Sequence, residues 1–177
     1  MTSGVKTARR RDFKQALLVG LIMGMTPLPA LADQDGVCTT SELKNPVRVV
    51  LRCPNGLVVE AETRADLRAL TGGRPPETVS IKNRAVLVET PKGNGAFQVK
   101  TPHAIASVRG TLFAVDATSN QSSVLVLRGQ VAVTSLTTRE TVVLSAGQGV
   151  VIAYDKPVQV KTWPEEKISA LLARFAR

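Results

Sequence analysis

Residues 97–115 read Phe-Gln-Val-Lys-Thr-Pro-His-Ala-Ile-Ala-Ser-Val-Arg-Gly-Thr-Leu-Phe-Ala-Val, from Phe97 to Val115. Short apolar or alternating runs are separated here by Pro102 and Gly110, which is typical of consecutive β-strands. The proline fixes its own φ and favours an extended residue before it, so it suits the start of a strand. The glycine tolerates a positive φ and suits a tight corner. This stretch therefore predicts three strands in close succession.

The same pattern continues on both sides of this stretch. From Val47 onward, runs rich in Val, Ile, Leu and Thr alternate with Gly, Asn and Pro turn signals. We expect an all-β fold: a compact β-sandwich, jelly-roll or short β-coil of about ten to twelve short strands, with a C-terminal amphipathic helix. The expected strands are Val47–Leu51, Leu57–Ala61, Val79–Ile81, Ala85–Thr90, Phe97–Thr101, Ala104–Val108, Leu112–Ala117, Val124–Leu127, Val131–Ser135, Thr141–Leu144, Val150–Tyr154 and Val158–Lys161.

One local pattern recurs three times and reads apolar, basic, Gly or Asn, polar, apolar. The copies are Ile81–Ala85, Val108–Leu112 and Leu127–Val131. Because Gly and Asn tolerate a positive φ, each copy predicts a tight corner with a long cation leaning outward over the bend. The three cations, which are candidate partner contacts, are Lys82, Arg109 and Arg128. For Arg109 we favour an internal ion pair with Asp116 or Glu89 over contact with an acidic ligand.

Two helices are expected. The segment Arg64–Leu70 follows a cap at Thr63, although a strand fits it equally well. Near the C-terminus, Thr162 and Glu165 have the spacing of a capping box around Pro164. The apolar residues that follow on one helical face are Ile168, Leu171, Leu172 and Phe175. Such a face usually docks on its own core, and docking on a partner is the alternative.

The first 32 residues have the organisation of a secretory signal peptide. Basic residues precede a short apolar run, Ala16–Met25, and the small residues Ala30 and Ala32 precede the expected cleavage before Asp33. A membrane anchor is the alternative, but it needs about 20 apolar residues and prolines interrupt this run. The segment Arg10–Lys14 also resembles a twin-arginine export signal. We expect an exported chain, periplasmic or secreted, with no transmembrane span after cleavage.

Composition argues against several classes of function. The net charge of +9 favours an anionic partner, but the expected signal peptide contributes five basic residues and one acid, and its removal leaves +5. The remaining bases are scattered and form no run that would track phosphates, so we expect no nucleic-acid partner. Only 3% of the residues are aromatic. This scarcity disfavours recognition of bases or sugar rings by stacking.

Cys38 and Cys53 predict a disulfide, because the compartment of an exported chain is oxidising. The alternative is a metal site that also uses the only histidine, His103, but the spacing does not match a structural zinc site. No recognisable catalytic motif surrounds a serine, a cysteine or a pair of acids, so we expect no enzyme, cofactor or metal. The acidic pairs are Glu60 with Glu62 and Glu165 with Glu166. The first pair lies on one face of an expected strand, and the second lies in the first turn of the expected helix, where acids favour the helix dipole. Each pair therefore has a structural explanation.

The segment Phe97–Val115 closely resembles the signature of the FecR domain family, and Val124–Val133 and Leu144–Val150 resemble the later strands of that domain. The signature positions are Thr101, Pro102, Ala106, Val108, Arg109, Gly110, Thr111 and Phe113. Their residue types favour a mainly structural role, since small residues permit close strand packing and Phe113 suits a core. The resemblance covers roughly Val79 to Ile152 and implies a periplasmic, β-rich domain that is not an enzyme.

Well-known members of the FecR family carry a signal from an outer-membrane receptor, through a transmembrane helix, to a cytoplasmic segment that binds a sigma factor. Here about fifteen residues precede the apolar run and 25 follow Ile152, so we expect the β module alone, without direct sigma-factor control. We expect a protein-interaction or signal-relay module with an envelope protein as partner. The alternative is an envelope structural or ligand-binding protein that contacts peptidoglycan, polysaccharide or anionic lipid. The expected organisation is a signal peptide at 1–32, an N-terminal β extension with the disulfide at 33–78, a FecR-like β domain at 79–155, and a C-terminal strand and helix at 156–177.

Overall fold

Two β-sheets and one helix make up the part of the chain that the computed structural model describes, residues 36–62, 74–93 and 95–177. The larger sheet has the strand order β1 (Thr39–Leu43), β2 (Arg48–Arg52), β3 (Val58–Glu62), β5 (Arg84–Glu89), β8 (Leu112–Ala117), β9 (Gln121–Arg128), β12 (Gln148–Ala153), β13 (Lys161–Thr162). The smaller sheet has the order β11 (Thr141–Ser145), β10 (Gln130–Ser135), β7 (Ala104–Val108), β6 (Phe97–Lys100), β4 (Thr78–Ser80). The helix α1 spans Glu165–Ala173. The predicted all-β fold with a C-terminal helix is confirmed. The predicted signal peptide and the predicted helix at Arg64–Leu70 lie outside the described residues.

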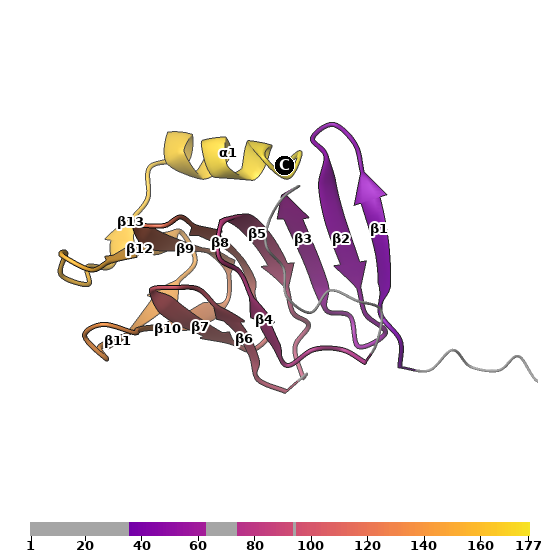
Figure 1. Cartoon of the computed structure of the whole chain (residues 1–177), viewed down its shortest axis with the longest axis horizontal. Helices are drawn as coiled ribbons and strands as arrows, with labels where there is room; N and C mark the ends of the chain where they lie inside the picture. The colour runs from indigo at the N-terminus through magenta and orange to yellow at the C-terminus, as the bar shows by residue number, and fades with distance from the viewer. Residues whose placement is uncertain (1–35, 63–73, 94) are drawn as a thin grey trace, which may run out of the picture. The chain divides into compact units, whose positions relative to one another are not determined.

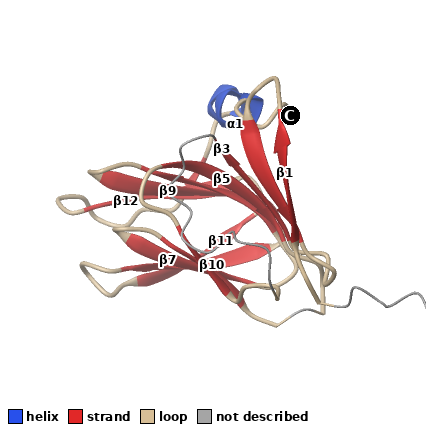
Figure 2. Ribbon diagram, turned by 45° about the vertical axis from the view of Figure 1, so that its right-hand side comes forward, coloured by secondary structure: helices blue, strands red, loops and turns tan. Residues whose placement is uncertain are grey.

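The two sheets lie as layers that face each other (Figures 1 and 2). Along β7, buried and half-buried residues alternate, so Ala104, Ala106 and Val108 enter the core between the sheets. From the larger sheet, Phe113 and Val115 of β8 enter the same core and are fully buried. Period-two alternation thus places one face of each sheet in a shared apolar core.

The larger sheet is also covered on its other face, where α1 lies across it (Figure 1). Ala85 and Leu87 of β5 point to this face and pack in a second cluster with Trp163, Leu171 and Phe175. The run Ala85–Val88 is therefore buried at every position, which explains why it reads as continuously apolar rather than alternating. The helix docks on the protein's own core, as the residue pattern favours. Among the described residues, α1 is the one helix, and its nine residues are too few to span a membrane.

The start of α1 differs from the sequence prediction. The N-cap residue is Pro164, and no side chain caps the helix. Thr162 cannot act as the cap because it belongs to β13, where it is paired with Gln148 of β12. The predicted capping box is therefore not formed. Two glutamates in the first turn, Glu165 and Glu166, remain favourable for the helix dipole.

Three further predictions need correction. The edge strand β1 was not expected, because Thr-Thr-Ser-Glu-Leu is almost wholly exposed and carries no apolar alternation. The predicted strand Val158–Lys161 is reduced to the short β13, since only Lys161 and Thr162 pair with β12. In the corner before β5, the positive φ of 66° belongs to Arg84 and not to Asn83.

The disulfide predicted between Cys38 and Cys53 is present. It connects the residue before β1 with the residue after β2, so it joins the open end of this hairpin. Both cysteines are buried in the core between the sheets. Because the two sulfur atoms are bonded to each other, neither is a thiolate that could serve the alternative metal site. The ring Nδ1 of His103 lies 3.0 Å from Ser122 Oγ.

Candidate functional site

Two of the three predicted corners meet at one end of the sandwich. Leu112 is paired with both Glu89 of β5 and Arg128 of β9, which brings the corner after Arg109 beside the corner after Arg128. Gly110 and Gly129 have φ values of +64° and +87°, as the corner pattern predicts. A Cβ on Gly129 would lie 3.0 Å from the carbonyl oxygen of Gly110. Both a positive φ and close backbone packing therefore require glycine here.

The third corner lies at the opposite end of the same strands. Strand β5 runs from Arg84, which is paired with Ala117, to Glu89, which is paired with Leu112. Because Lys82 precedes Arg84, it lies at the Ala117 end, away from Arg109 and Arg128. The three corner cations therefore do not share one surface.

The two cations that meet differ in their bonding. Arg128 donates a hydrogen bond from Nη2 to Glu89 Oε1 at 2.8 Å, in an exposed ion pair. The two acids expected to pair with Arg109 have other partners, since Glu89 pairs with Arg128 and Asp116 pairs with Arg174. In the described ranges of the chain, no ion pair includes the exposed Arg109. The internal pairing favoured for Arg109 is thus not made, and its guanidinium faces solvent.

Arg109 lies where two shallow hollows adjoin. One is formed at the strand ends by the corner glycines and Lys92, and the other lies on the outer face of the smaller sheet. Arg109 and Gln130 line both hollows. We call the area formed by Lys92, Arg109, Gln130, Ala132 and Val143 the Arg109 surface. Its most exposed apolar residue is Val143, at 59%. An exposed arginine beside apolar side chains is a common composition for a protein interface.

The remaining signature residues have structural positions. Thr101 shapes the turn from β6 to β7, where its Oγ1 accepts hydrogen bonds from the backbone N–H groups of His103 and Ala104. Thr111 is fully buried and is joined to Thr90 by backbone and side-chain hydrogen bonds. The other signature residues are Ala106, Val108 and Phe113 in the core and Pro102 in the exposed turn. Pro102 lies within the turn and not at the start of a strand, since β7 begins at Ala104.

A cluster of ion pairs under α1 was not predicted from the sequence. Arg174 donates to Glu62 at 2.7 and 2.5 Å and to Asp116 at 2.8 and 3.3 Å. Glu60 accepts from Arg177 at 2.7 Å and from Arg48 at 2.9 Å. We call these six residues the arginine–carboxylate cluster. Glu60 and Glu62 alternate with the core residues Val59 and Ala61, which is the sequence signal that they share the face turned to α1.

This cluster shifts the pKa values of Glu60, Glu62 and Arg174. Burial raises the pKa of Glu60, but the hydrogen bonds from Arg177 and Arg48 outweigh it and hold the pKa below its usual range. Burial acts in the same way on Glu62, where Arg174 and the backbone N–H of Ala85 lower the pKa. The hydrogen bond to Glu62 raises the pKa of Arg174, although burial opposes it. The acid pair considered for catalysis is thus held as two ion-paired carboxylates that dock the helix.

The profile of the family described as "FecR protein" matches residues 41–132, which begin in β1 and end in β10. None of the curated proteins matches the chain.

Two crystal structures, at 2.50 and 1.65 Å resolution, of a "putative anti-sigma factor" from Parabacteroides distasonis ATCC 8503 are similar to the chain at 18% identity and a TM-score of 0.48. The similarity covers 76% of this chain and 60% of the other, so this chain spans less than two thirds of the length of that chain. Since the family profile matches more than half of its residues, this chain belongs to the FecR protein family.

Proposed function

We propose that this chain is a non-enzymatic FecR-domain protein that acts in the periplasm as a protein-interaction and signal-relay module of the bacterial cell envelope. The observation that carries the proposal is membership of the FecR family over residues 41–132. The FecR resemblance implies binding of an envelope protein and relay of its state. The expected export signal in the first 32 residues supports the compartment.

The Arg109 surface is the contact that we propose for the protein partner. Two features support it: Arg109 is exposed and makes no ion pair with any described acid, and Val143 is exposed beside it. A partner that supplies a carboxylate opposite Arg109 and an apolar side chain opposite Val143 fits this surface. Arg128 is a weaker candidate because Glu89 already binds it. Lys82 lies at the other end of the strands and belongs to a separate surface.

The test is site-specific photocrosslinking in intact cells. A tagged full chain carries a photoreactive amino acid at position 143, and the matched control carries it at position 154, where Tyr154 is 82% exposed in the loop after β12. We expect a defined envelope protein to be captured from position 143 but not from position 154. The substitution Arg109→Glu should abolish the capture, because it places a negative charge opposite the expected carboxylate.

Two outcomes would contradict the proposal. The same proteins captured from both positions would mean that the Arg109 surface has no specific partner. Capture of glycan or lipid alone would favour the envelope-binding alternative. Circular dichroism of the Arg109→Glu variant checks that the fold is intact.

A further inference from the structure

A pocket with three lysines lies on the outer face of the larger sheet, at its β13 edge. It has a volume of about 320 Å³, at the small end of the range for ligand pockets. Its walls come from β12, the loop that follows it, β13 and the first turn of α1. We call it the Trp163 pocket. It is lined by Gly149, Val151, Lys156, Pro157, Gln159, Lys161, Thr162, Trp163, Pro164 and Lys167.

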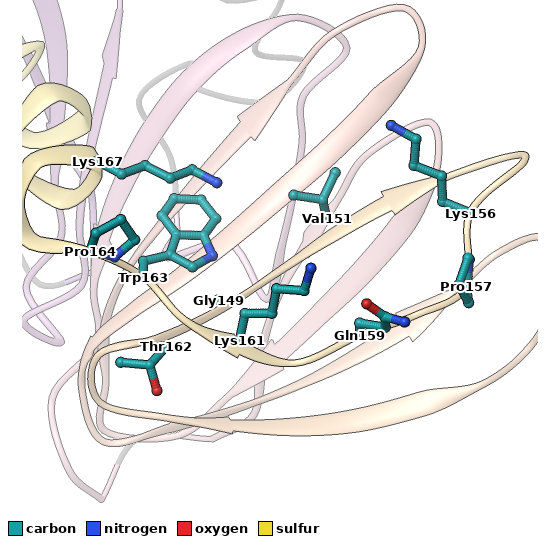
Figure 3. A pocket seen from close by; sticks show the side chains of 10 residues that line it. All are labelled: Gly149, Val151, Lys156, Pro157, Gln159, Lys161, Thr162, Trp163, Pro164 and Lys167. Atoms are coloured by element: carbon teal, nitrogen blue, oxygen red, sulfur yellow. The ribbon is translucent and has the colours of Figure 1, made fainter.

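The charge in this pocket has one sign. Figure 3 shows the amino groups of Lys156, Lys161 and Lys167 on three sides of Val151. No aspartate or glutamate lines the pocket, and among the described residues no acid forms an ion pair with these lysines. Asp116 lines the adjoining hollow, but Arg174 already pairs with it. Three ammonium groups around one cavity create a positive potential that favours an anion.

The floor of the pocket is apolar and held in place. Trp163 is only 7% exposed, and its ring packs against the backbone of Gly149, where an added Cβ would lie 2.4 Å from the ring. The amino group of Lys167 lies 3.6 Å from the ring centroid, a cation–π contact that fixes both side chains. Val151 and Pro157 extend the apolar lining. The site therefore offers apolar contact beside its positive charges.

Trp163 also contributes a hydrogen-bond donor. Within the described part of the chain, the Nε1–H of Trp163 donates to no acceptor. Because no fully buried side-chain nitrogen or oxygen of these residues lacks a partner, this nitrogen is accessible from the pocket side. Figure 3 shows this nitrogen on the side of the ring that faces Lys161. An indole N–H can only donate, so it adds a directed contact for an oxyanion.

We propose that the Trp163 pocket binds a small organic anion, in which a phosphate or carboxylate group is attached to an apolar body. The oxyanion contacts Lys156, Lys161 and the indole N–H of Trp163, while the apolar body lies on Val151 and Pro157. Lys167 completes the positive rim. This site is separate from the Arg109 surface, and its test does not depend on the proposed protein partner.

The test uses the fluorescence of Trp163, which is the only tryptophan of the chain. The full chain is titrated with phenyl phosphate, with inorganic phosphate as a probe without an apolar body. We expect saturable quenching by phenyl phosphate, weaker binding of inorganic phosphate, and loss of affinity at raised ionic strength. The variant Lys156→Gln/Lys161→Gln keeps the Lys167–Trp163 contact and should bind phenyl phosphate about tenfold to a hundredfold more weakly.

The matched control is Lys44→Gln/Lys100→Gln, which removes the same charge from exposed lysines outside the pocket. Its affinity should remain within about twofold of the unchanged chain. An equal loss in both double variants, equal affinity for the two phosphates, or no saturable change at millimolar phenyl phosphate would overturn the proposal.

A second arm distinguishes a free ligand from a lipid headgroup. Phosphatidylcholine vesicles with and without phosphatidylglycerol are sedimented with the chain and with both double variants. Binding that needs phosphatidylglycerol and is lost only in Lys156→Gln/Lys161→Gln identifies a headgroup as the anion. Phenyl phosphate binding without vesicle binding identifies a free anion. Both results support the pocket as the anion site.

Discussion

Replacing Arg174 by glutamine removes the guanidinium that joins α1 to both β3 and β8. The side chain of Arg174 is 30% exposed, and those of Glu62 and Asp116 are 18% and 29% exposed. Exposed ion pairs contribute about 0–1 kcal/mol, whereas removal of one partner of a buried pair costs about 3–5 kcal/mol. The half-buried geometry lies between these limits, so we expect Arg174→Gln to lower the free energy of unfolding by about 2 kcal/mol.

Urea denaturation followed by far-UV circular dichroism measures this loss, and at a slope of about 1–3 kcal/mol per molar urea the midpoint falls by about 1 M. The fluorescence of Trp163 is a second probe, because this residue packs in the same cluster as Leu171 and Phe175 of the C-terminal segment. A fluorescence transition at lower urea than the dichroism transition would show that the helix detaches first.

The control for this prediction is Arg52→Gln, in an exposed arginine of β2. We expect its stability to stay within about 0.5 kcal/mol of the unchanged chain. A double-mutant cycle of Arg174→Gln with Glu62→Gln should give a coupling energy of about 1–2 kcal/mol, since the glutamine oxygen still accepts from the N–H of Ala85. If Arg174→Gln is no less stable than Arg52→Gln, the ion pairs do not hold the helix and the reasoning is refuted.

Three further predictions concern stability. Arginines hold the pKa values of Glu60 and Glu62 below their usual range, so the contribution of these ion pairs to the free energy of unfolding is complete above the unfolded-state pKa of about 4.3. This contribution is lost as the pH falls below that value. Urea midpoints across a pH series should show the decline in stability, and Glu62→Gln should make it smaller. Replacing Cys38 and Cys53 by alanine opens a loop with a sequence separation of 15 and should cost about 3 kcal/mol of unfolding free energy, whereas an unchanged urea midpoint would contradict the chain-entropy estimate. Gly149→Ala should displace the Trp163 ring, shift its fluorescence and lower stability by about 1–3 kcal/mol, while Gly95→Ala, where an added Cβ meets nothing within 4 Å, should leave both unchanged.

Strand positions were predicted well where local chemistry decides them. The bounds of β7 and β8 match the prediction because the turn with Pro102 and the corner at Gly110 end the apolar runs on either side. The disulfide was predicted from the cysteine count and the expected export of the chain. Strand β1 was missed because an edge strand that is exposed on both faces needs no apolar alternation. Its pairing with β2 depends on the partner strand rather than on its own sequence.

The candidate sites depended more on tertiary pairing. The corner pattern correctly located Gly110 and Gly129, but strand register alone decides that Arg109 and Arg128 meet while Lys82 does not. Glu62 and Asp116 both pair with Arg174, which lies 112 and 58 residues further along the chain. No local sequence pattern reveals such distant pairs. The Trp163 pocket is lined mainly by residues 156–167, which include its three lysines, but only the pairing of β13 with β12 places this stretch around Gly149 and Val151.

The position of the arginine–carboxylate cluster along the chain also constrains the order of folding. Glu60 is made long before Arg177, because 117 residues separate these hydrogen-bonded partners. A chain that emerges N-terminus first therefore has Arg48 as the early partner of Glu60, but it lacks Arg174 and Arg177 until nearly the whole sequence is available. Pairing over such a distance slows the formation of these ion pairs, because the entropy of a long loop must be lost before the contact can form. Docking of the C-terminal helix is thus a late step of folding, and until it is complete the unfinished sheet exposes the apolar side chains of Leu87 and Leu125.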